Sequence, residues 1–294
     1  MAKKRYKKNK NKLSNLVVLV LVALGLYAYD KYVKTSNVNT NPTSEMQIQT
    51  EASSSVADAS VEVTEPQAEV VTDGSNPYFV ERLTGTEVSS TDENGNPLGS
   101  AQWGATFLLG DLDVYGRATW GHILVSDAQE PGQNGLAREG KITVDPADWK
   151  NYKLNGSWVN DRTHTVGFQF GGVNSDKRVL TTAGAYLNRG TAGSGSNQDN
   201  PDSMLYYEQR LDSWLATHPN FKLDLYVQPI YEGTSGVVRQ MYMQWIGIDN
   251  NNETIEINIG GHSIVDGNGY SYVVLDNVFP DYNIDYQTGQ VTQK

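Results

Sequence analysis

The 294-residue chain contains no cysteine, which excludes disulfide bridges, thiolate metal sites and cysteine nucleophiles. Histidine is scarce as well, with four residues, so few side chains are available to titrate near neutral pH. The Gly-x-Ser-x-Gly elbow of serine hydrolases is missing. The same holds for a Walker-type phosphate loop, although glycines are frequent after residue 190.

Positive charge is scarce outside the N-terminus. Of the 23 lysines and arginines, eight lie in residues 1–32, together with one of the 34 acidic residues. The rest of the chain is therefore strongly acidic, whereas contacts to nucleic-acid phosphates come mainly from lysine and arginine. An enzyme that acts on nucleic acid would have to rely on a local site here, because the bulk charge is unfavourable.

One apolar run, Leu16–Tyr29, follows a basic cluster at the N-terminus. A basic start, an apolar centre and a polar continuation form the layout of an export signal. The lysine-rich flank predicts that the N-terminus stays on the cytoplasmic side and that the remainder of the chain lies on the outer side of the membrane. We predict residues 1–32 to be a basic N-terminus with a hydrophobic signal-anchor, which makes the protein a single-pass protein of the cell membrane. Ala23 and Gly25 satisfy a small-x-small cleavage rule, so secretion after cleavage is the alternative.

Aromatic residues are absent from residues 33–76, which are rich in Ser, Thr, Val, Glu, Asn and Gln. Such a composition predicts a disordered spacer, and the folded domain is predicted to span residues 77–294. Within it, residues 92–97 and 266–269 are typical of turns. Apolar residues alternate with polar ones over Leu223–Val227 and over Ile255–Ile259, which predicts two half-buried strands.

A helix is predicted from Ser203 to Thr217, capped by Ser203 or Asp202 and ended by His218-Pro219. Its apolar face consists of Tyr207, Leu211, Trp214 and Leu215. Glu208 falls at the margin of this face, where a carboxylate is costly unless a cation or hydrogen-bond donors compensate it. Glu208 is therefore the first candidate for a functional residue.

Among the histidines, His164 has the most informative neighbours. His218 is explained by the helix end, where an imidazolium suits the helix dipole. His262 lies in a glycine-rich turn with nothing around it, and His122 has no partner nearby in the sequence. His164 follows Asp161-Arg162-Thr163, which supplies an acceptor that could orient a base and a guanidinium that could bind phosphate.

A second cluster, Thr181-Thr182-Ala183-Gly184-Ala185-Tyr186-Leu187-Asn188-Arg189-Gly190, is followed by a polar loop and then by Met204-Leu205-Tyr206-Tyr207-Glu208. Together with the residues around His164, this order resembles the bacterial DNA/RNA non-specific endonucleases. The likeness is greatest to the membrane-anchored and secreted nucleases of Gram-positive bacteria. It continues, in consistent order, over roughly residues 105 to 289.

The resemblance implies an α+β chain with the ββα-metal nuclease fold, in which a central antiparallel sheet is flanked by helices. It implies that His164 is the general base, that Asn188 binds one Mg²⁺, with Mn²⁺ as an alternative, and that Glu208 holds waters of that ion. Arg162 completes the predicted catalytic set as a phosphate-binding residue. A single neutral protein oxygen suffices for Mg²⁺ if waters and a phosphate complete its octahedron. The predicted activity is endonucleolytic cleavage of DNA and RNA without base specificity, outside the cell, giving 5′-phosphate ends.

The chain departs from the family pattern at three positions. Thr163 replaces the glycine before the histidine, Val179 stands where the family often has asparagine, and Asp212 stands where it often has a phosphate-binding arginine. Arg210 or Arg189 are candidates to replace that arginine. Val179, Asp212 and the acidic body favour the alternative of a catalytically weak or inactive nuclease-like surface domain.

A calcium-binding module is a further alternative, because acidic and amide residues crowd residues 249–253. That run lacks the central glycine and the distal glutamate of a calcium loop. We therefore predict a turn there.

Overall fold

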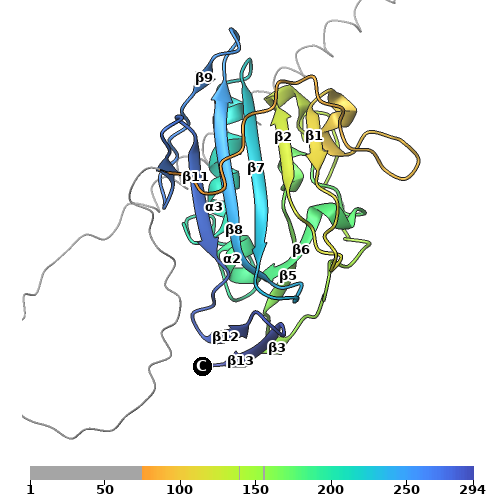
Figure 1. Ribbon diagram of the computed structural model, residues 1–294, viewed down its shortest axis with the longest axis vertical. Coiled ribbons are helices and arrows are strands. Elements are labelled where there is room, and N and C mark those ends of the chain that lie inside the picture. The colour runs from red at the N-terminus through yellow and green to blue at the C-terminus, as the bar shows by residue number, and fades with distance from the viewer. Residues whose placement is uncertain (1–74, 139, 155) are drawn as a thin grey trace, which may run out of the picture. The chain divides into compact units, whose positions relative to one another are not determined.

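The computed structural model describes residues 75–138, 140–154 and 156–294 (Figure 1). These residues belong to one compact unit. The predicted signal-anchor and the predicted spacer up to residue 74 lie outside the described residues. Within the described ranges, none of the helices has the length and apolar character needed to cross a membrane.

A seven-stranded antiparallel sheet forms the centre of this unit. Its order is β1 (Thr106–Leu109), β2 (Gly121–Val125), β7 (Lys222–Tyr231), β8 (Val238–Ile248), β11 (Ser271–Asp276) and β10 (Ile264–Val265), with β9 (Thr254–Ile255) paired to β8. The smaller two-stranded sheets are β3 (Lys153–Leu154) with β4 (Ser157–Trp158), β5 (Asn160–His164) with β6 (Leu180–Gly184), and β12 (Tyr282–Asp285) with β13 (Gln290–Gln293). The helices are α2 (Ala185–Arg189) and α3 (Met204–Thr217), and the short 3-10 turns are η1 (Gly99–Trp103), η2 (Asp127–Gln129), η3 (Phe168–Phe170) and η4 (Lys177–Val179).

The strand predicted at Leu223–Val227 is confirmed as part of β7, but its half-buried character is wrong. Leu223 and Leu225 belong to the main core, and the intervening Asp224 and Tyr226 are buried as well. The second face of the sheet is covered by the extended segment 75–90, which crosses in front of β7 and β8 in Figure 1. Backbone N–H groups of this segment donate to the sheet, for example from Val80 to Gln244 Oε1 at 3.2 Å.

The strand predicted at Ile255–Ile259 is wrong in extent, because β9 ends at Ile255. The carbonyl oxygen of Ile257 accepts hydrogen bonds from Trp245 Nε1 at 2.9 Å and from Ser271 Oγ at 3.0 Å. Side chains of the neighbouring strands therefore take the place of a strand partner, and the chain leaves the sheet with its backbone still satisfied.

The predicted turns are confirmed. Asp92 Oδ1 accepts from the backbone N–H groups of Asn94 and Asn96, at 2.9 and 2.8 Å, as expected of an aspartate that opens a turn. Gly269 has a φ of 84° and closes the turn between β10 and β11. In the acidic run at 249–253, Asp249 Oδ1 likewise accepts backbone N–H groups within its own turn.

The predicted helix is confirmed as α3, which ends before His218. Ser203 is its N-cap residue, but the expected side-chain cap is not made, because the Ser203 hydroxyl donates to Asn200 O at 2.9 Å. Tyr207 packs against Trp245 of β8, with ring centroids 5.7 Å apart. Full burial of each such apolar side chain contributes about 1.5–3 kcal/mol, so the buried face fixes α3 on the sheet.

The elements β5, β6 and α3 form the ββα arrangement that the resemblance implied, and the predicted α+β fold class is confirmed. β5 and β6 are antiparallel, with His164 opposite Leu180 and Thr163 opposite Thr181. The short helix α2 follows β6 directly, and the longer α3 lies behind β7 and β8 in Figure 1. The ends of β5, α2 and α3 are thereby brought to one region.

Candidate active site

One cavity of about 230 Å³ is lined by all four predicted site residues. Arg162 and His164 come from β5, Asn188 comes from α2, and Glu208 comes from α3. The other lining residues are Arg138, Ile142, Gly167, Phe168, Gln169, Arg189, Ser196, Leu205 and Gln209. The fold thus collects residues that lie far apart along the chain, while their roles stay predictions.

His164 is the last residue of β5, and its imidazole is enclosed. Its Nε2 lies 3.0 Å from Asn174 Oδ1. Burial lowers the pKa of His164 to about 4; the positive charge of Arg138 acts in the same direction, while Asn174 and the Val173 backbone oppose it. The imidazole is therefore neutral at neutral pH and able to accept a proton.

The pKa of Glu208 is shifted in the opposite direction from that of His164, because its carboxylate is buried and poorly hydrated. Burial raises its pKa to about 7, and the negative charge of Asp212 adds to the rise, whereas Gln169 and Arg138 favour the charged form. The Gln169 Nε2 is buried without a well-aligned hydrogen-bond partner among the described residues. A cation in this cavity would stabilise the charged carboxylate.

Asn188 is oriented by Asp161. Asn188 Nδ2 donates to Asp161 Oδ2 at 3.0 Å, and Arg189 Nε donates to the same oxygen at 2.8 Å. Because the amide nitrogen is held in this way, the Asn188 Oδ1 remains as an oxygen ligand. The interpretation of Asp161 as the acceptor that orients His164 is wrong, since residues three apart on a strand point to opposite sides.

The donors in the cavity fit a hydrated divalent ion. Among residues 75–138, 140–154 and 156–294, no group of three His, Asp or Glu side chains could hold a metal by itself. The cavity instead offers one amide oxygen from Asn188 and one desolvated carboxyl group from Glu208. Hard oxygen donors of this kind suit an ion that keeps most of its waters.

The arginines differ in how firmly they are already held. Arg162 Nε lies 2.7 Å from Asp145 Oδ1, and its guanidinium stacks over Trp149 at 4.7 Å from the ring centroid. Arg189 is bound to Asp161 and to Gly193 O. Arg210, a candidate to replace the family's arginine, does not line the cavity; it stacks on Tyr206 at 3.5 Å and donates to Gln198 O at 3.0 Å.

Arg138 is the cavity residue that the sequence did not reveal. Its side chain makes no hydrogen bond or ion pair with another described residue, and its charge reaches both His164 and Glu208. It lies in a polar loop without a recognisable motif, so no local pattern could have singled it out. Of the arginines that line the cavity, Arg138 is the one not bound to a carboxylate of the described chain.

The residues that depart from the family pattern lie outside the cavity lining. Val179 is fully buried in the core, and its carbonyl accepts from Thr165 N at 2.9 Å. Asp212 faces other acids: burial raises its pKa and the charge of Asp127 adds to the rise. Nearby, burial raises the pKa of Glu130 to about 8, with contributions from Asp212 and Asp127.

The remaining histidines have partners that the sequence did not reveal. His122 Nε2 lies 2.8 Å from Asp224 Oδ1, and both side chains are buried. His262, expected to have nothing around it, has its Nε2 2.9 Å from Asp202 Oδ1. His218 ends α3 as predicted, with its Nδ1 2.8 Å from Trp214 O.

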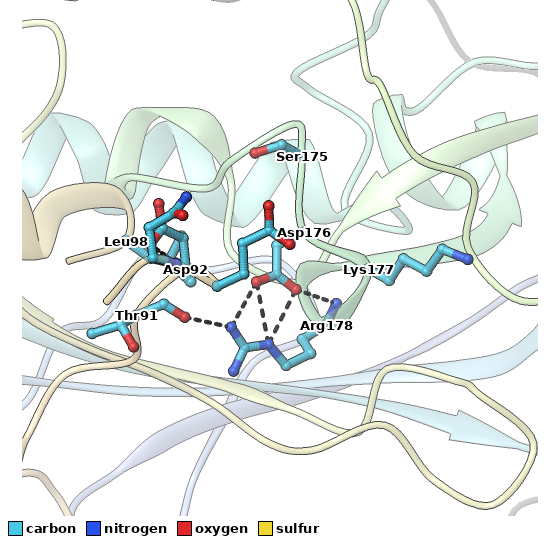
Figure 2. A pocket seen from close by; sticks show the side chains of 9 residues that line it. Thr91, Asp92, Leu98, Ser175, Asp176, Lys177 and Arg178 are labelled. Carbon is cyan, nitrogen blue, oxygen red and sulfur yellow. Dashed lines mark hydrogen bonds and ion pairs between the residues drawn. The ribbon is translucent and has the colours of Figure 1, made fainter. Parts of the chain in front are cut away.

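A second cavity, of about 600 Å³, lies between residues 91–98 and 175–178 and is drawn in Figure 2. It contains none of the predicted site residues. Its arginine is already neutralised, because Arg178 donates to both carboxylate oxygens of Asp176 and to Thr91 O. Its arginine is therefore not available to bind a phosphate unless Asp176 is displaced.

Comparison with known proteins agrees with this picture. A family described as DNA/RNA non-specific endonuclease matches residues 101–246. A solved structure titled extracellular nuclease is 40% identical, covers 65% of this chain and 94% of its own, and has a TM-score of 0.53. A second, titled extracellular endonuclease, is also 40% identical, covers 64% and 86%, and has a TM-score of 0.54.

A more distant solved structure, of NucA from Streptococcus agalactiae with magnesium ion bound, is 14% identical, covers 65% of this chain and 78% of its own, and has a TM-score of 0.46. That distant likeness says nothing about the metal of this chain. No sequence among the curated proteins matches the chain.

The chain belongs to the DNA/RNA non-specific endonuclease family, as its identity to two solved nucleases over most of their length shows. The predicted family is thereby confirmed. The chain is a nuclease by this membership, and its substrate class is nucleic acid.

Proposed function

We propose that the protein is an extracellular endonuclease that hydrolyses phosphodiester bonds of DNA and RNA without base specificity, with Mg²⁺ as its metal. One observation carries the proposal: a single cavity joins a neutral imidazole, an oriented amide oxygen, a desolvated carboxyl group and the guanidinium of Arg138, which has no partner among the described residues. Together they can supply a base for the attacking water, a ligand for a divalent ion and a positive charge for the phosphate. The names of the two 40% identical relatives support an extracellular location, and the apolar N-terminal run supports export, with membrane anchoring favoured over cleavage.

His164 acts as the general base in this proposal. Its lowered pKa keeps the imidazole neutral, so that it can take a proton from the water that attacks phosphorus. Asn188 Oδ1 would hold the ion, and Glu208 would bind its hydration waters. When bound, Mg²⁺ or Mn²⁺ supplies positive charge that stabilises the phosphate and the departing 3′-oxygen.

Arg138 and Arg162 would hold the substrate phosphate. Arg138 can do so without giving up a partner among the described residues, whereas Arg162 has to exchange its exposed partner Asp145 for phosphate. A guanidinium matches phosphate geometry with two parallel hydrogen bonds. Contacts of this kind address the backbone and not the base edges, which supports cleavage without sequence preference and on either sugar.

The test is digestion of supercoiled plasmid and of single-stranded RNA by the full-length chain, with Mg²⁺, with Mn²⁺ and with chelator. We expect cleavage only with metal, and a loss of about 10²–10⁴-fold in the His164→Ala variant. His262→Ala is the matched control, because His262 is exposed and does not line the cavity. It should cut like the unaltered chain.

Intact substrate under every condition would refute the enzymatic proposal. The second candidate, a nuclease-like domain that binds without cutting, would then stand. It is favoured by one specific feature, the aspartate at position 212 where the family often has an arginine, and nucleic-acid binding without cleavage would support it.

A further inference from the structure

The partner of the His164 imidazole is an uncharged side chain. Asn174 Oδ1 lies 3.0 Å from His164 Nε2, and an amide oxygen only accepts hydrogen bonds. The ring nitrogen that faces it must therefore carry the proton. In a neutral imidazole whose Nε2 donates to Asn174 the lone pair is on Nδ1, and the Val173 backbone, which also has a hydrogen bond with the ring, is the second group that bears on the tautomer.

Asn174 is itself held in place. It is only 5% exposed. Its backbone carbonyl oxygen accepts hydrogen bonds from Thr143 N at 2.9 Å and from Thr143 Oγ1 at 3.2 Å. The segment that follows is clamped, as Figure 2 shows: Arg178 Nη2 donates to Asp176 Oδ2 at 2.7 Å and to Thr91 O at 2.9 Å. The amide thus belongs to a loop whose backbone is fixed on both sides.

The choice of an amide in place of a carboxylate has an electrostatic consequence. The charged groups that line the cavity with His164 are Arg138, Arg162, Arg189 and Glu208, and Asp161 is turned towards Asn188. A carboxylate at position 174 would favour the imidazolium. An amide orients the ring without adding that charge, so the base stays neutral.

We propose that Asn174 is a positioning residue for His164, which keeps the proton on Nε2 and leaves the Nδ1 lone pair to accept a proton from the attacking water. This inference rests on the proposed function of His164 as the general base. It adds the residue that selects the reactive ring nitrogen, which lies ten positions further along the chain and outside the motif that contains the histidine.

The experiment compares the full-length unaltered chain with Asn174→Ala and Asn174→Asp. The ¹⁵N shifts of labelled histidine, recorded without added metal and assigned with His164→Gln, report the tautomer directly. We expect the Nε2–H form in the unaltered chain and a mixture of forms in Asn174→Ala. The kcat of Asn174→Ala for DNA cleavage should fall roughly 10- to 100-fold with little change in KM.

Asn174→Asp keeps the shape and the acceptor, so it guards against misfolding of the alanine variant. It should retain the Nε2–H form, and its acid limb of kcat against pH should move up by about one unit or more, because the carboxylate stabilises the imidazolium. Rates well above that limb should return to within a few-fold of the unaltered chain. Asn252→Asp, in an exposed turn outside the cavity lining, adds the same charge and should leave the profile unchanged.

Two results would overturn this inference and leave the proposed function standing. The first is the Nδ1–H form in the unaltered chain. The second is that the Asn174 variants have the same tautomer and pH profile as the unaltered chain, while His164→Ala is inactive. An unaltered chain that fails to cut any substrate would overturn the proposed function and this inference together. A fall in kcat with an unchanged tautomer in both variants also counts against it, because that result indicates a merely structural role.

Discussion

The pair formed by His122 and Asp224 lies on the face of the sheet opposite α3, away from the cavity. His122 Nε2 is 2.8 Å from Asp224 Oδ1, and Leu83 N donates to Asp224 Oδ2 at 2.8 Å. The two side chains are 4% and 0% exposed. We predict that this pair fixes segment 75–90 on the sheet and has no part in catalysis, and Asp224→Ala is the perturbation that tests it.

The expected loss of stability follows from the groups that the substitution leaves unpaired. A buried donor left without its acceptor costs about 1–3 kcal/mol, and Asp224→Ala removes the acceptor of both the His122 imidazole and the Leu83 N–H. Because the two effects share one site and do not add fully, we expect about 4 kcal/mol for Asp224→Ala. This corresponds to a fall in Tm of about 8–16 °C for a domain of this size.

Urea unfolding at pH 7, followed by tryptophan fluorescence, measures this loss. Asp224→Asn keeps an oxygen acceptor and the shape, so it should lose less than half as much. Asp281→Ala, at an exposed position, is the control and should change stability by less than about 0.5 kcal/mol. A loss below about 1 kcal/mol for Asp224→Ala, or a folded variant without nuclease activity, would refute the reasoning.

Three further outcomes test the cavity and its surroundings. Arg138→Ala should lower kcat/KM for DNA about 100-fold with unchanged stability; an unaltered initial rate would remove Arg138 from the site. In Gly167→Ala the added Cβ would lie 2.8 Å from Glu208 Oε1 and 2.9 Å from Gln169 Oε1. Because these contacts would displace the Glu208 carboxyl group, DNA cleavage should fall about 100-fold. A normal rate would show that the carboxyl group can move aside without loss of activity. Burial raises the pKa of Glu130 from 4.5 to about 8, so the native chain holds its proton longer than the unfolded chain and loses stability as pH rises through this range. In urea titrations Glu130→Gln should therefore equal the unaltered chain near pH 4 and exceed it by on the order of 3 kcal/mol at pH 8–9; a difference independent of pH would contradict this.

The sequence predicted correctly those elements whose start, end and buried face are determined by residues within the element itself. The apolar face and the His218-Pro219 stop predicted α3, because both act within the helix itself. The alternation of Ile255 and Ile257 gave the right burial but the wrong extent for β9. Whether a strand continues depends on its neighbours, and here Trp245 and Ser271 bind the Ile257 carbonyl.

The candidate site was predictable only in part, for a related reason. The family resemblance and the position of Glu208 on the helix margin pointed to residues that do line one cavity. The supporting contacts were not predictable from nearby sequence: Asp161 serves Asn188, and Asn174 serves His164. Such pairs depend on which side of a strand a residue occupies and on where a later loop returns.

The acidic body and a nucleic-acid substrate are compatible because the two charges act over different distances. At physiological salt, charge is screened beyond about 8 Å, so the acidic surface lowers the rate of encounter more than the strength of contact within the cavity. Inside it, Arg138 has no carboxylate partner among the described residues, and burial has raised the pKa of the Glu208 carboxyl group. A phosphate that enters with a divalent ion therefore meets the charge of that ion and the Arg138 guanidinium, and the net charge of −11 does not decide whether it binds.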